Sequence, residues 1–335
     1  MGKILITGAS GFIGSFIVEA ALNKGFDIWA GIRKSSSRVY LQDNRLQFID
    51  LHISDKEKLK TQLKEFQDTH GKWDYIIHNA GVTKCQDKND FDKINFQFTR
   101  NFADALLECN MQPDKFILMS SLSAWGPVNE ISMQPINLQE IPCPNTEYGK
   151  SKLKAGQYIQ SLSDFPYIIL HPTGVYGPRE KDYYLMFKSV KQGIDFIVGR
   201  KAQYITFIYV KDLVNAIFLA IEKNVTNKSY CVSDGNTYTA TDFSELIQQK
   251  LRKKHVFRLM IPLPVVKIIS IISEKLAMCF GKISTLNGDK YHIFKQRNWM
   301  CDISRLQQEL DFKPAYDLER GVEETISWYK KEKWL

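Results

Sequence analysis

The feature that most constrains the fold of this sequence is a glycine-rich turn that directly follows a short apolar run near the N-terminus. The turn spans residues 8–14 with the letters GASGFIG, and the apolar run spans residues 4–6. A buried strand that ends in such a turn and continues as a helix points backbone N–H groups at one place, which suits a pyrophosphate. Gly8 would permit the tight turn, Gly11 the approach of a ligand, and Gly14 close packing of the helix on the sheet. The alternative is a strand-to-helix turn without a ligand.

Short apolar runs alternate with helical patterns through the first half of the chain. The predicted strands lie at residues 4–6, 27–32, 46–49, 75–78, 115–119 and 167–170, and the predicted helices at 12–23, 55–69, 92–109 and 147–163. Strands that helices cover on both faces are typical of an open parallel sheet. The sequence therefore predicts an α/β fold, a Rossmann-like doubly wound parallel sheet with a smaller C-terminal substrate lobe.

The predicted division into domains follows from the place where this alternation loosens, after Pro172. We expect a dinucleotide-binding domain at residues 1–172, to which residues 203–223 return. Residues 173–202 and 224–335 are expected to form the smaller substrate-binding lobe. A chain of 335 residues is long enough for such a division.

Composition favours a reduced cytoplasmic compartment and a small-molecule substrate. The net charge is +8, but the lysines are spread along the chain, so we expect no nucleic-acid partner. The apolar run at residues 4–6 is too short for a secretion signal. The six cysteines have no paired spacing that would indicate a zinc site or a disulfide framework, and they are Cys85, Cys109, Cys143, Cys231, Cys279 and Cys301.

The most apolar segment is residues 264–280, which carries three charges and falls short of the length that spans a membrane. We therefore expect no stable membrane insertion. Its apolar residues recur at helical spacing, at positions 265, 268, 269, 272, 276 and 279. This pattern predicts a core helix, and a pocket wall or a helix on a membrane surface is the alternative.

A tyrosine and a lysine stand four residues apart in a segment with a helical pattern. Tyr148 and Lys152 would then share one face of a helix, where the ammonium favours the phenolate. Such a tyrosine can donate or accept a proton near neutral pH. An exposed aromatic and cation pair is the alternative.

Several motifs together resemble the extended short-chain dehydrogenase/reductase family. They are the glycines at 8, 11 and 14, the run HNAG at 78–81, the serines at 120 and 121, and Tyr148 with Lys152. Later segments resemble the epimerase/dehydratase branch of that family, at residues 175–179, 207–212 and 328–329. The resemblance covers nearly the whole chain and implies an enzyme that uses NAD(P).

The resemblance implies a role for each matching position. Tyr148 would be the proton donor or acceptor, Lys152 would lower its pKa and hold the nicotinamide ribose, and Ser121 would bond the reacting oxygen, with Ser120 and Ser123 as alternatives. Asn95 would support a water path or strand packing. The cofactor-binding positions would be Gly8, Ser10, Gly11, Phe12, Ile13, Arg33, Asp50, Leu51, Ala80, Gly81, Tyr148, Lys152 and Pro172.

The choice of cofactor depends on the residues about twenty positions after the glycines. An NAD site of this kind has an acidic residue there, but this chain has Ile32 followed by Arg33 and Lys34. Two basic side chains can pair with a 2′-phosphate. The sequence therefore predicts NADP, with NAD as the alternative.

Two departures from the family pattern bear on the substrate. Gly174 stands where many nucleotide-sugar enzymes of the family have an asparagine, and Ile205 stands where they have an arginine. A diphosphate would need other partners, for which Arg179, Lys181, Arg200 and Lys201 are candidates. The leading hypothesis is therefore an oxidoreductase acting on a secondary alcohol or ketone. The alternatives are a nucleotide-sugar epimerase or dehydratase that recycles its cofactor, and a non-catalytic cofactor-binding sensor.

The resemblance also implies a homodimer. Its interface would pair the helices at residues 92–109 and 147–163 with their mates. Apolar residues there could instead pack on the chain's own sheet, namely Phe96, Phe102, Leu106 and Leu107.

Overall fold

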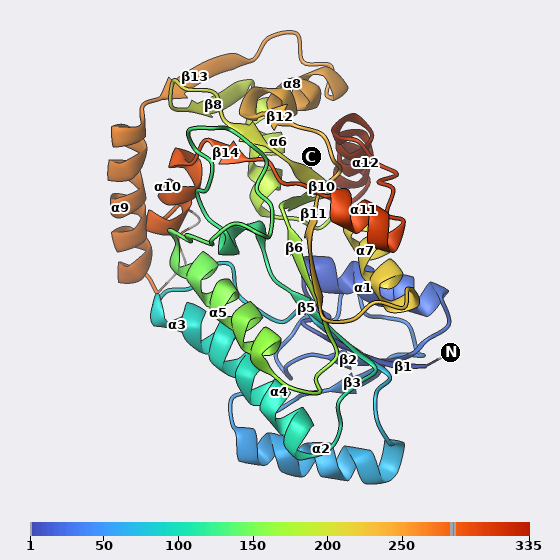
Figure 1. The fold of residues 1–335 in the computed structure, drawn as a ribbon. Coiled ribbons are helices and arrows are strands. Elements are labelled where there is room, and N and C mark those ends of the chain that lie inside the picture. The colour runs from blue at the N-terminus through green and yellow to red at the C-terminus, as the bar shows by residue number, and fades with distance from the viewer. Residues whose placement is uncertain (1, 282–283, 285) are drawn as a thin grey trace.

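The computed structural model describes residues 2–281, 284 and 286–335. Its main feature is a seven-stranded sheet (Figure 1). The strands are β1 (Lys3–Thr7), β2 (Asp27–Gly31), β3 (Gln47–Ile49), β4 (Tyr75–His78), β5 (Lys115–Met119), β6 (Tyr167–Pro172) and β11 (Lys228–Val232). They are all parallel, in the order β11-β6-β5-β4-β1-β2-β3. The prediction of a Rossmann-like doubly wound sheet is confirmed.

Helices cover both faces of this sheet, as Figure 1 shows. One face carries α1 (Phe12–Asn23) and α7 (Val210–Glu222), and the other carries α2 (Lys56–His70), α4 (Phe98–Glu108) and α5 (Glu147–Ser161). The strands alternate between the two cores: Ile4 and Ile6 of β1 pack with α1, whereas Leu5 packs with α2 and α4. Because both faces are covered, the central residues of these strands are mostly apolar, while several strands begin with a polar or charged residue.

The remaining elements are short strands and helices, some of which enclose a third core of largely aromatic residues. The short strands are β7 (Gly174–Tyr176), β8 (Ile194–Val198), β9 (Tyr204–Ile205), β10 (Phe207–Tyr209), β12 (Tyr238–Thr239), β13 (Phe257–Ile261) and β14 (Asn298–Trp299). The helices are α3 (Asn89–Phe91), α6 (Asp182–Lys191), α8 (Ala240–Lys250), α9 (Leu263–Cys279), α10 (Gly288–Lys295), α11 (Ser304–Leu310) and α12 (Leu318–Lys331). A π-helical segment, Asp92–Gln97, precedes α4, and a 3-10 turn, Leu122–Ala124, follows β5.

The structure differs from the predicted domain boundaries at one strand. β11 lies within the range 224–335 that we assigned to the smaller lobe, yet it pairs with β6 along its whole length. Its apolar residues Tyr230, Cys231 and Val232 complete the first core. The division of the chain into two domains otherwise stays a prediction.

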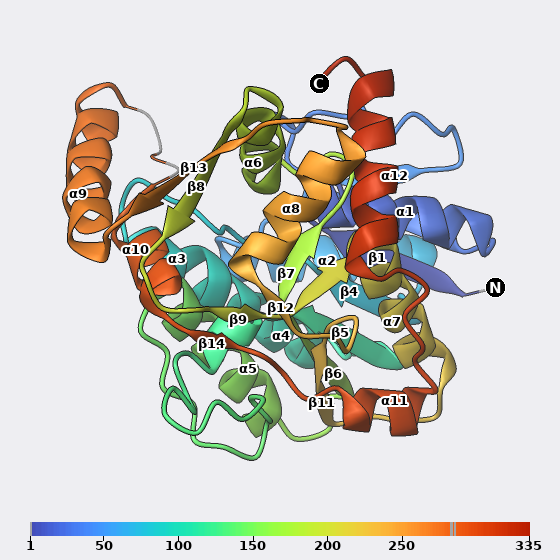
Figure 2. The ribbon, with the colours of Figure 1, turned by 90° about the horizontal axis from the view of Figure 1, so that it is seen from above.

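The prediction of a core helix at residues 264–280 is wrong. In α9 only Val266 and Ser270 are buried, and the apolar positions that we expected to face the core are exposed. Figure 2 shows the helix at the edge of the molecule, with one side against α10. None of the helices in the described part of the chain has the length and apolarity needed to cross a membrane.

Candidate active site

The glycine-rich turn between β1 and α1 forms an open cradle. Gly8 has a φ of +67°, and a Cβ there would lie 2.9 Å from the backbone nitrogen of Ala80. A Cβ on Gly14 would lie 2.1 Å from the carbonyl oxygen of Gly8. The first turn of α1 can therefore pack closely against the glycine-rich turn only because residue 14 has no side chain. Gly11, the N-cap of α1, is exposed and has no side chain to cover the first N–H groups of the helix. These groups fit a phosphate.

The other residues predicted to hold the cofactor lie along the same edge of the sheet. Register pairs align the last residue of β1, Thr7, with Gly31 of β2 and His78 of β4, so the loops after these three strands leave the sheet at this edge. Ser10, Phe12 and Ile13 lie in the glycine turn and the start of α1, and Arg33 lies after β2. Asp50 and Leu51 follow β3, Ala80 and Gly81 follow β4, and Pro172 ends β6.

The two basic residues after β2, Arg33 and Lys34, are both exposed. The backbone N–H of Lys34 donates to Oδ2 of Asp50 at 3.0 Å, and Ile32 is buried. The Arg33 side chain is exposed. Its guanidinium is therefore the group at this edge best suited to bind a phosphate.

The first turn of α5 holds Tyr148 in place by its backbone. Oγ1 of Thr146, the N-cap, accepts a hydrogen bond from the N–H of Gly149 at 2.9 Å. Oδ2 of Asp289 accepts from the N–H of Tyr148 itself at 3.2 Å. The ring of Phe91 meets the ring of Tyr148 edge-on, with 6.1 Å between the ring centroids.

The predicted lowering of the pKa of Tyr148 by Lys152 is not what the structure shows. Burial raises the pKa of the Tyr148 phenol, and the Ser121 side chain next to it partly offsets this rise. Nζ of Lys152 donates instead to the carbonyl oxygen of Met119, at 2.8 Å. Burial lowers the pKa of Lys152 to about 8. The reason is that both groups lie in a poorly solvated environment, which disfavours their charged forms.

Ser121 is the serine next to the Tyr148 phenol. It follows β5 as the N-cap of the 3-10 turn, and its Oγ accepts a hydrogen bond from the N–H of Ser123 at 3.2 Å. Nδ1 of the buried His171 lies 3.3 Å from the Ser121 carbonyl oxygen, and burial lowers the pKa of His171 to about 4. Ser120 is buried, and its hydroxyl has no hydrogen-bond partner among the described residues.

Asn95 joins the end of β4 to α5. Its Oδ1 accepts from the N–H of Val82 at 2.8 Å, and its Nδ2 donates to the Val82 carbonyl and to Oγ of Ser151, both at 3.0 Å. Asn95 lies in the π-helical segment, a kind of irregularity that is frequent at functional sites. The amide is fully bonded, so this residue fixes the position of the backbone around it.

A series of hydrogen bonds connects Asn95 with Thr7, the last residue before the glycine turn. Oγ1 of Thr7 bonds Nδ1 of His78 at 2.9 Å and accepts from the N–H of Ala80 at 3.1 Å. Nε2 of His78 bonds Oγ1 of Thr99 at 3.0 Å, and Thr99 donates to the Asn95 carbonyl at 2.8 Å. Burial lowers the pKa of His78 to about 3, so the ring is neutral at physiological pH.

Gly81 is where the cofactor-binding and catalytic positions come closest. A Cβ there would lie 2.8 Å from Oδ1 of Asn95 and 3.1 Å from Nζ of Lys152. Only a glycine therefore lets the loop after β4 approach Asn95 and the lysine ammonium this closely. The structure therefore brings the predicted positions Gly81, Lys152, Tyr148 and Ser121 into one region.

Sequence reasoning missed several residues that position this site. Thr146 could have been found, because a threonine before a helix is a common N-cap. Asp289 and Phe91 gave no signal, since Asp289 is 141 residues from Tyr148 and both are ordinary in composition. Thr7 and Ser151 were adjacent to predicted motifs but carried no distinguishing pattern.

Arg179, one of the residues expected to bind a diphosphate in place of the missing arginine, already has partners within the chain. Arg179 donates to Oγ of Ser15 at 2.9 Å and forms an ion pair with Glu19. Its guanidinium lies 4.3 Å from the ring centre of Phe16 and 4.2 Å from that of Tyr40. Arg179 therefore already has partners on α1, and its binding of a substrate diphosphate stays a prediction.

An aromatic side chain fills the space at Gly174. A Cβ on Gly174 would lie 2.4 Å from the hydroxyl of Tyr183 and 3.2 Å from the ring of Phe207. An asparagine at this position would need both rings to move. The wall here is aromatic, and the pKa of the Tyr183 phenol is raised by burial.

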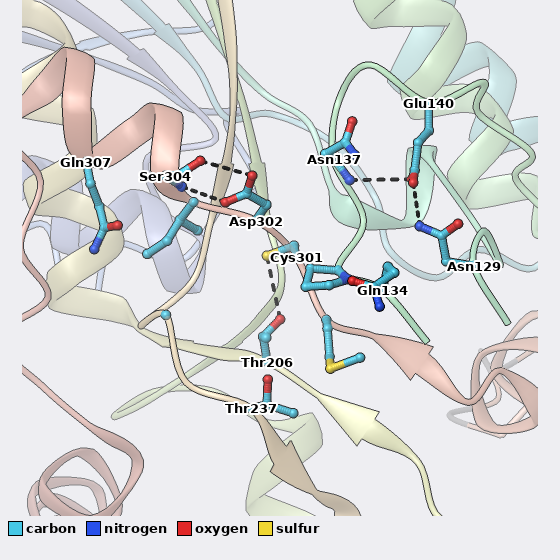
Figure 3. A pocket seen from close by; sticks show the side chains of 14 residues that line it. Asn129, Gln134, Asn137, Glu140, Thr206, Thr237, Cys301, Asp302, Ser304 and Gln307 are labelled. Carbon is cyan, nitrogen blue, oxygen red and sulfur yellow. Dashed lines mark hydrogen bonds between the residues drawn. The ribbon is translucent and has the colours of Figure 1, made fainter. Parts of the chain in front are cut away.

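A cavity of about 620 Å³ lies away from these groups (Figure 3). Figure 3 shows polar side chains around it, including Glu140 bonded to Asn129 and Asp302 bonded to Ser304. Ser121, Tyr148 and Lys152 are not among its lining residues. Volume alone does not identify this cavity as the reaction site, because the residues predicted to be catalytic do not line it.

Comparison with known proteins gives a family for this arrangement. A model described as the NAD dependent epimerase/dehydratase family matches residues 4–233. UDP-glucose 4-epimerase from Vibrio cholerae is 23% identical over 339 residues, which cover 96% of this chain and 94% of that protein. A decarboxylating sterol-4-alpha-carboxylate 3-dehydrogenase from Saccharomyces cerevisiae is 23% identical over 353 residues, covering 97% of each chain.

A solved structure shares the fold. The dTDP-glucose 4,6-dehydratase of Bacillus anthracis in complex with NAD superimposes with a TM-score of 0.76 at 21% identity. The match covers 100% of this chain and 98% of that one. At this identity the likeness shows the fold, and the chemistry of this chain has to be argued from its own residues.

Proposed function

Since this chain belongs to the NAD-dependent epimerase/dehydratase family and is an enzyme of that kind, we propose that it catalyses reversible hydride transfer at a secondary alcohol or ketone. The observation that carries this proposal is the half-buried Tyr148 next to Ser121, with Lys152 one helical turn away and the glycine turn at the same edge of the sheet. A bound nicotinamide cofactor would supply or accept the hydride.

Each catalytic residue has one task in this proposal. Tyr148 gives its proton to the substrate oxygen during reduction and takes it back during oxidation. Ser121 donates a hydrogen bond to the same oxygen and so stabilises the charge that develops on it. Lys152 holds the nicotinamide ribose, since its ammonium lies beside Gly81 in the predicted cofactor-binding loop.

For the cofactor we propose NADP in preference to NAD. The exposed Arg33 guanidinium follows β2, where an acidic residue would bind the ribose hydroxyls of NAD, and Ile32 is buried. Lys34 supports the same loop through its backbone bond to Asp50. The uncapped start of α1 at Gly11 supports binding of the pyrophosphate.

The residues around Gly174 and Arg179 support a net oxidoreductase. Tyr183 and Phe207 fill the space around Gly174, and Arg179 is bound to Ser15 and Glu19. Loss of a charged hydrogen bond to a diphosphate costs about 1.5–3 kcal/mol. A second candidate is a nucleotide-sugar epimerase or dehydratase with a recycled cofactor, which the UDP-glucose 4-epimerase relative favours.

We also propose a homodimer through α4 and α5. Phe102 and Leu106 do not contribute to such an interface, because both are fully buried in the chain's own second core. Phe96 and Leu107 are half-buried and leave part of their surface for a partner. Sedimentation equilibrium would give a mass of two chains if this interface forms.

The test of this function is a panel assay that measures net consumption of NADPH and NADH. The panel contains UDP-glucose, dTDP-glucose and an apolar ketone. The proposal predicts stoichiometric oxidation of NADPH with the ketone, and Arg33→Ala should raise the KM for NADPH at least about tenfold with little effect on NADH. Arg45→Ala is the matched control. Arg45 lies in the same connection between β2 and β3 as Arg33, but its guanidinium is paired with Asp43. Conversion of a nucleotide sugar without net cofactor consumption would instead support the second candidate.

A further inference from the structure

Helix α9 carries its apolar side chains on the wrong face for a core helix. The residues that face the protein are small or polar: Val266 and Ser270 are buried, and Ser273, Glu274 and Ala277 are half-buried. The exposed large side chains are Val265, Ile268, Ile269, Ile271, Ile272, Leu276, Met278 and Phe280. Ile272 is 52% exposed and Phe280 is 74% exposed. A contiguous apolar face of this kind marks an interaction surface.

Specific contacts on the polar face fix this orientation. Glu274 accepts a hydrogen bond from the N–H of Gly288 at 3.2 Å and pairs with Lys88 at 3.7 Å. Oγ of Ser273 is hydrogen-bonded to Oγ of Ser284 at 2.7 Å. Rotation of the helix to bury its isoleucines would break these bonds, so the outward apolar face belongs to the folded state.

The apolar surface continues into the strand before the helix. β13 ends at Ile261, with only Pro262 between it and the start of α9 at Leu263, and it pairs in parallel with β8. The exposed large residues on these two strands are Phe257, Leu259, Met260, Ile194 and Phe196. Figures 1 and 2 both show β8 and β13 leading to α9 at the edge of the molecule. We call α9 with β8 and β13 the α9 surface.

The segments that flank the α9 surface carry more basic than acidic residues, although Arg258 of β13 pairs with Asp195 of β8 and with Glu245. Residues 251–281 contain the basic residues Arg252, Lys253, Lys254, Arg258, Lys267 and Lys275, with Glu274 as the sole acidic residue of that stretch of sequence. Lys267 and Lys275 are exposed on α9 itself. Arg200 and Lys201 are exposed just after β8, where Gly199 meets Leu263 at the start of α9. A second copy of this chain would bring the same positive charge and be repelled.

From these observations we infer that the α9 surface docks on an anionic lipid bilayer. The 17 residues of α9 make a helix of about 25 Å, shorter than the hydrocarbon core of a bilayer, so the helix lies in the interface. The isoleucines and Phe280 enter the acyl region, and Lys267 and Lys275 reach the headgroup phosphates. This binding does not depend on the catalytic reaction.

The docked orientation brings the membrane near the catalytic helix. α10 packs against α9, and Asp289 of α10 accepts the hydrogen bond from the Tyr148 N–H. When α9 lies on the bilayer, α10 is therefore the element between Tyr148 and the lipid surface. If the proposed function holds, a lipid-dissolved alcohol or ketone is the substrate class that this arrangement serves.

Co-sedimentation of the full chain with vesicles tests the docking. One vesicle is phosphatidylcholine alone, and the other contains about one third phosphatidylglycerol. The inference predicts binding to the anionic vesicles that weakens as salt is added. Ile268→Gln/Ile272→Gln/Leu276→Gln should lose about tenfold or more of this binding with an unchanged melting temperature. Lys267→Gln/Lys275→Gln should lose about tenfold or more on anionic vesicles alone.

The matched control makes the same chemical change elsewhere. Ile131 and Ile141 are exposed apolar residues outside the α9 surface, so Ile131→Gln/Ile141→Gln should bind vesicles as the unmodified chain does. Failure of the unmodified chain to bind anionic vesicles would overturn the inference, as would equal loss in the control. Oligomers that form without lipid and disappear in the α9 variant would show that a second copy covers this surface, which would also overturn it. Because vesicle binding requires no turnover, failure of docking and failure of the proposed function are separate results.

Discussion

Helices α5 and α9 both depart from the usual distribution of polar and apolar residues, but in opposite directions. α5 buries Lys152 and Ser151, whereas α9 exposes a row of isoleucines. In α5 each buried polar group finds a partner inside the chain: Lys152 donates to the Met119 carbonyl, and Ser151 accepts from Asn95. In α9 the exposed apolar groups find none within the described structure.

The two departures have different kinds of explanation. A buried polar group is tolerated when hydrogen bonds replace those it made with water, so the reason for α5 lies within the fold. An exposed apolar face has no such internal compensation, so its reason lies outside the chain. The two helices therefore predict different responses to mutation: changes in α5 alter catalysis and stability, and changes in α9 alter binding to a surface.

The largest expected effect concerns Tyr148. Tyr148→Phe removes the proton donor and should lower the rate of hydride transfer by about 10²–10⁴-fold, while cofactor binding stays the same. Steady-state kinetics and calorimetric titration with NADPH measure the two quantities. Tyr158→Phe is the control, because Tyr158 lies on the same helix and bonds Asp104. Equal loss in both variants would contradict the assignment of Tyr148.

The next effect contrasts the core of the sheet with the α9 surface. Leu106→Ala in α4 removes a fully buried side chain and should lower the free energy of unfolding by about 2–5 kcal/mol. Ile272→Ala in α9 should change it by less than about 0.5 kcal/mol, because that side chain is exposed in the folded state too. Urea unfolding measures both. A large destabilisation by Ile272→Ala would mean that α9 is a core helix after all.

Lys152→Met tests the cost of the buried charge. Burial lowers the pKa of Lys152 from 10.5 to about 8, so the unfolded chain holds this proton more tightly than the folded chain. The resulting penalty, at most about 3 kcal/mol, is complete below pH 8 and disappears as the pH rises toward 10.5. The variant should thus gain stability over the unmodified chain mainly below pH 8, while losing activity.

The control for this pH dependence is on the same helix. Lys150 is exposed and pairs with Glu147, so Lys150→Met makes the same substitution on the same helix without removing a buried charge. The measurement is urea unfolding of the three proteins between pH 8 and 10.5. If the advantage of Lys152→Met did not shrink as the pH rises, the lysine would not be desolvated in the folded state.

The smallest of these effects concerns Asn95. Asn95→Ala leaves the Val82 backbone and Ser151 without their partner, which should cost about 1–3 kcal/mol of unfolding free energy. Because Val82 follows Gly81, the KM for the cofactor should rise more than kcat falls. Asn101→Ala removes one half-buried bond to the Ile53 carbonyl and serves as the milder comparison. An unchanged KM in Asn95→Ala would limit Asn95 to a structural role.

Sequence reasoning predicted the sheet well because its signals are local. The alternation of apolar runs and helices gave the strands β1 to β6 within a few residues, and the family match confirms the resemblance to the extended short-chain dehydrogenase/reductase family. The glycines at 8 and 14 were recognisable by their spacing after the apolar run, and the structure shows that neither position has room for a side chain.

The parts that could not be predicted depend on contacts between distant segments. Asp289 reaches Tyr148 across 141 residues, and Arg179 binds Glu19 across 160. The failure at α9 has a different cause. Helical periodicity shows that apolar residues share a face, but it does not show whether that face meets the core or the outside, and here it faces outward.

Transfer of deuterium from C4-deuterated NADPH to the product is the sharpest test of the proposed reaction. The unmodified enzyme is incubated with the labelled cofactor and each compound of the ketone and nucleotide-sugar panel, and the products are analysed by mass spectrometry. Net hydride transfer predicts one deuterium on the carbinol carbon of the alcohol formed from a ketone, in step with oxidation of the cofactor. Epimerised or dehydrated nucleotide sugar formed without net cofactor oxidation would contradict it.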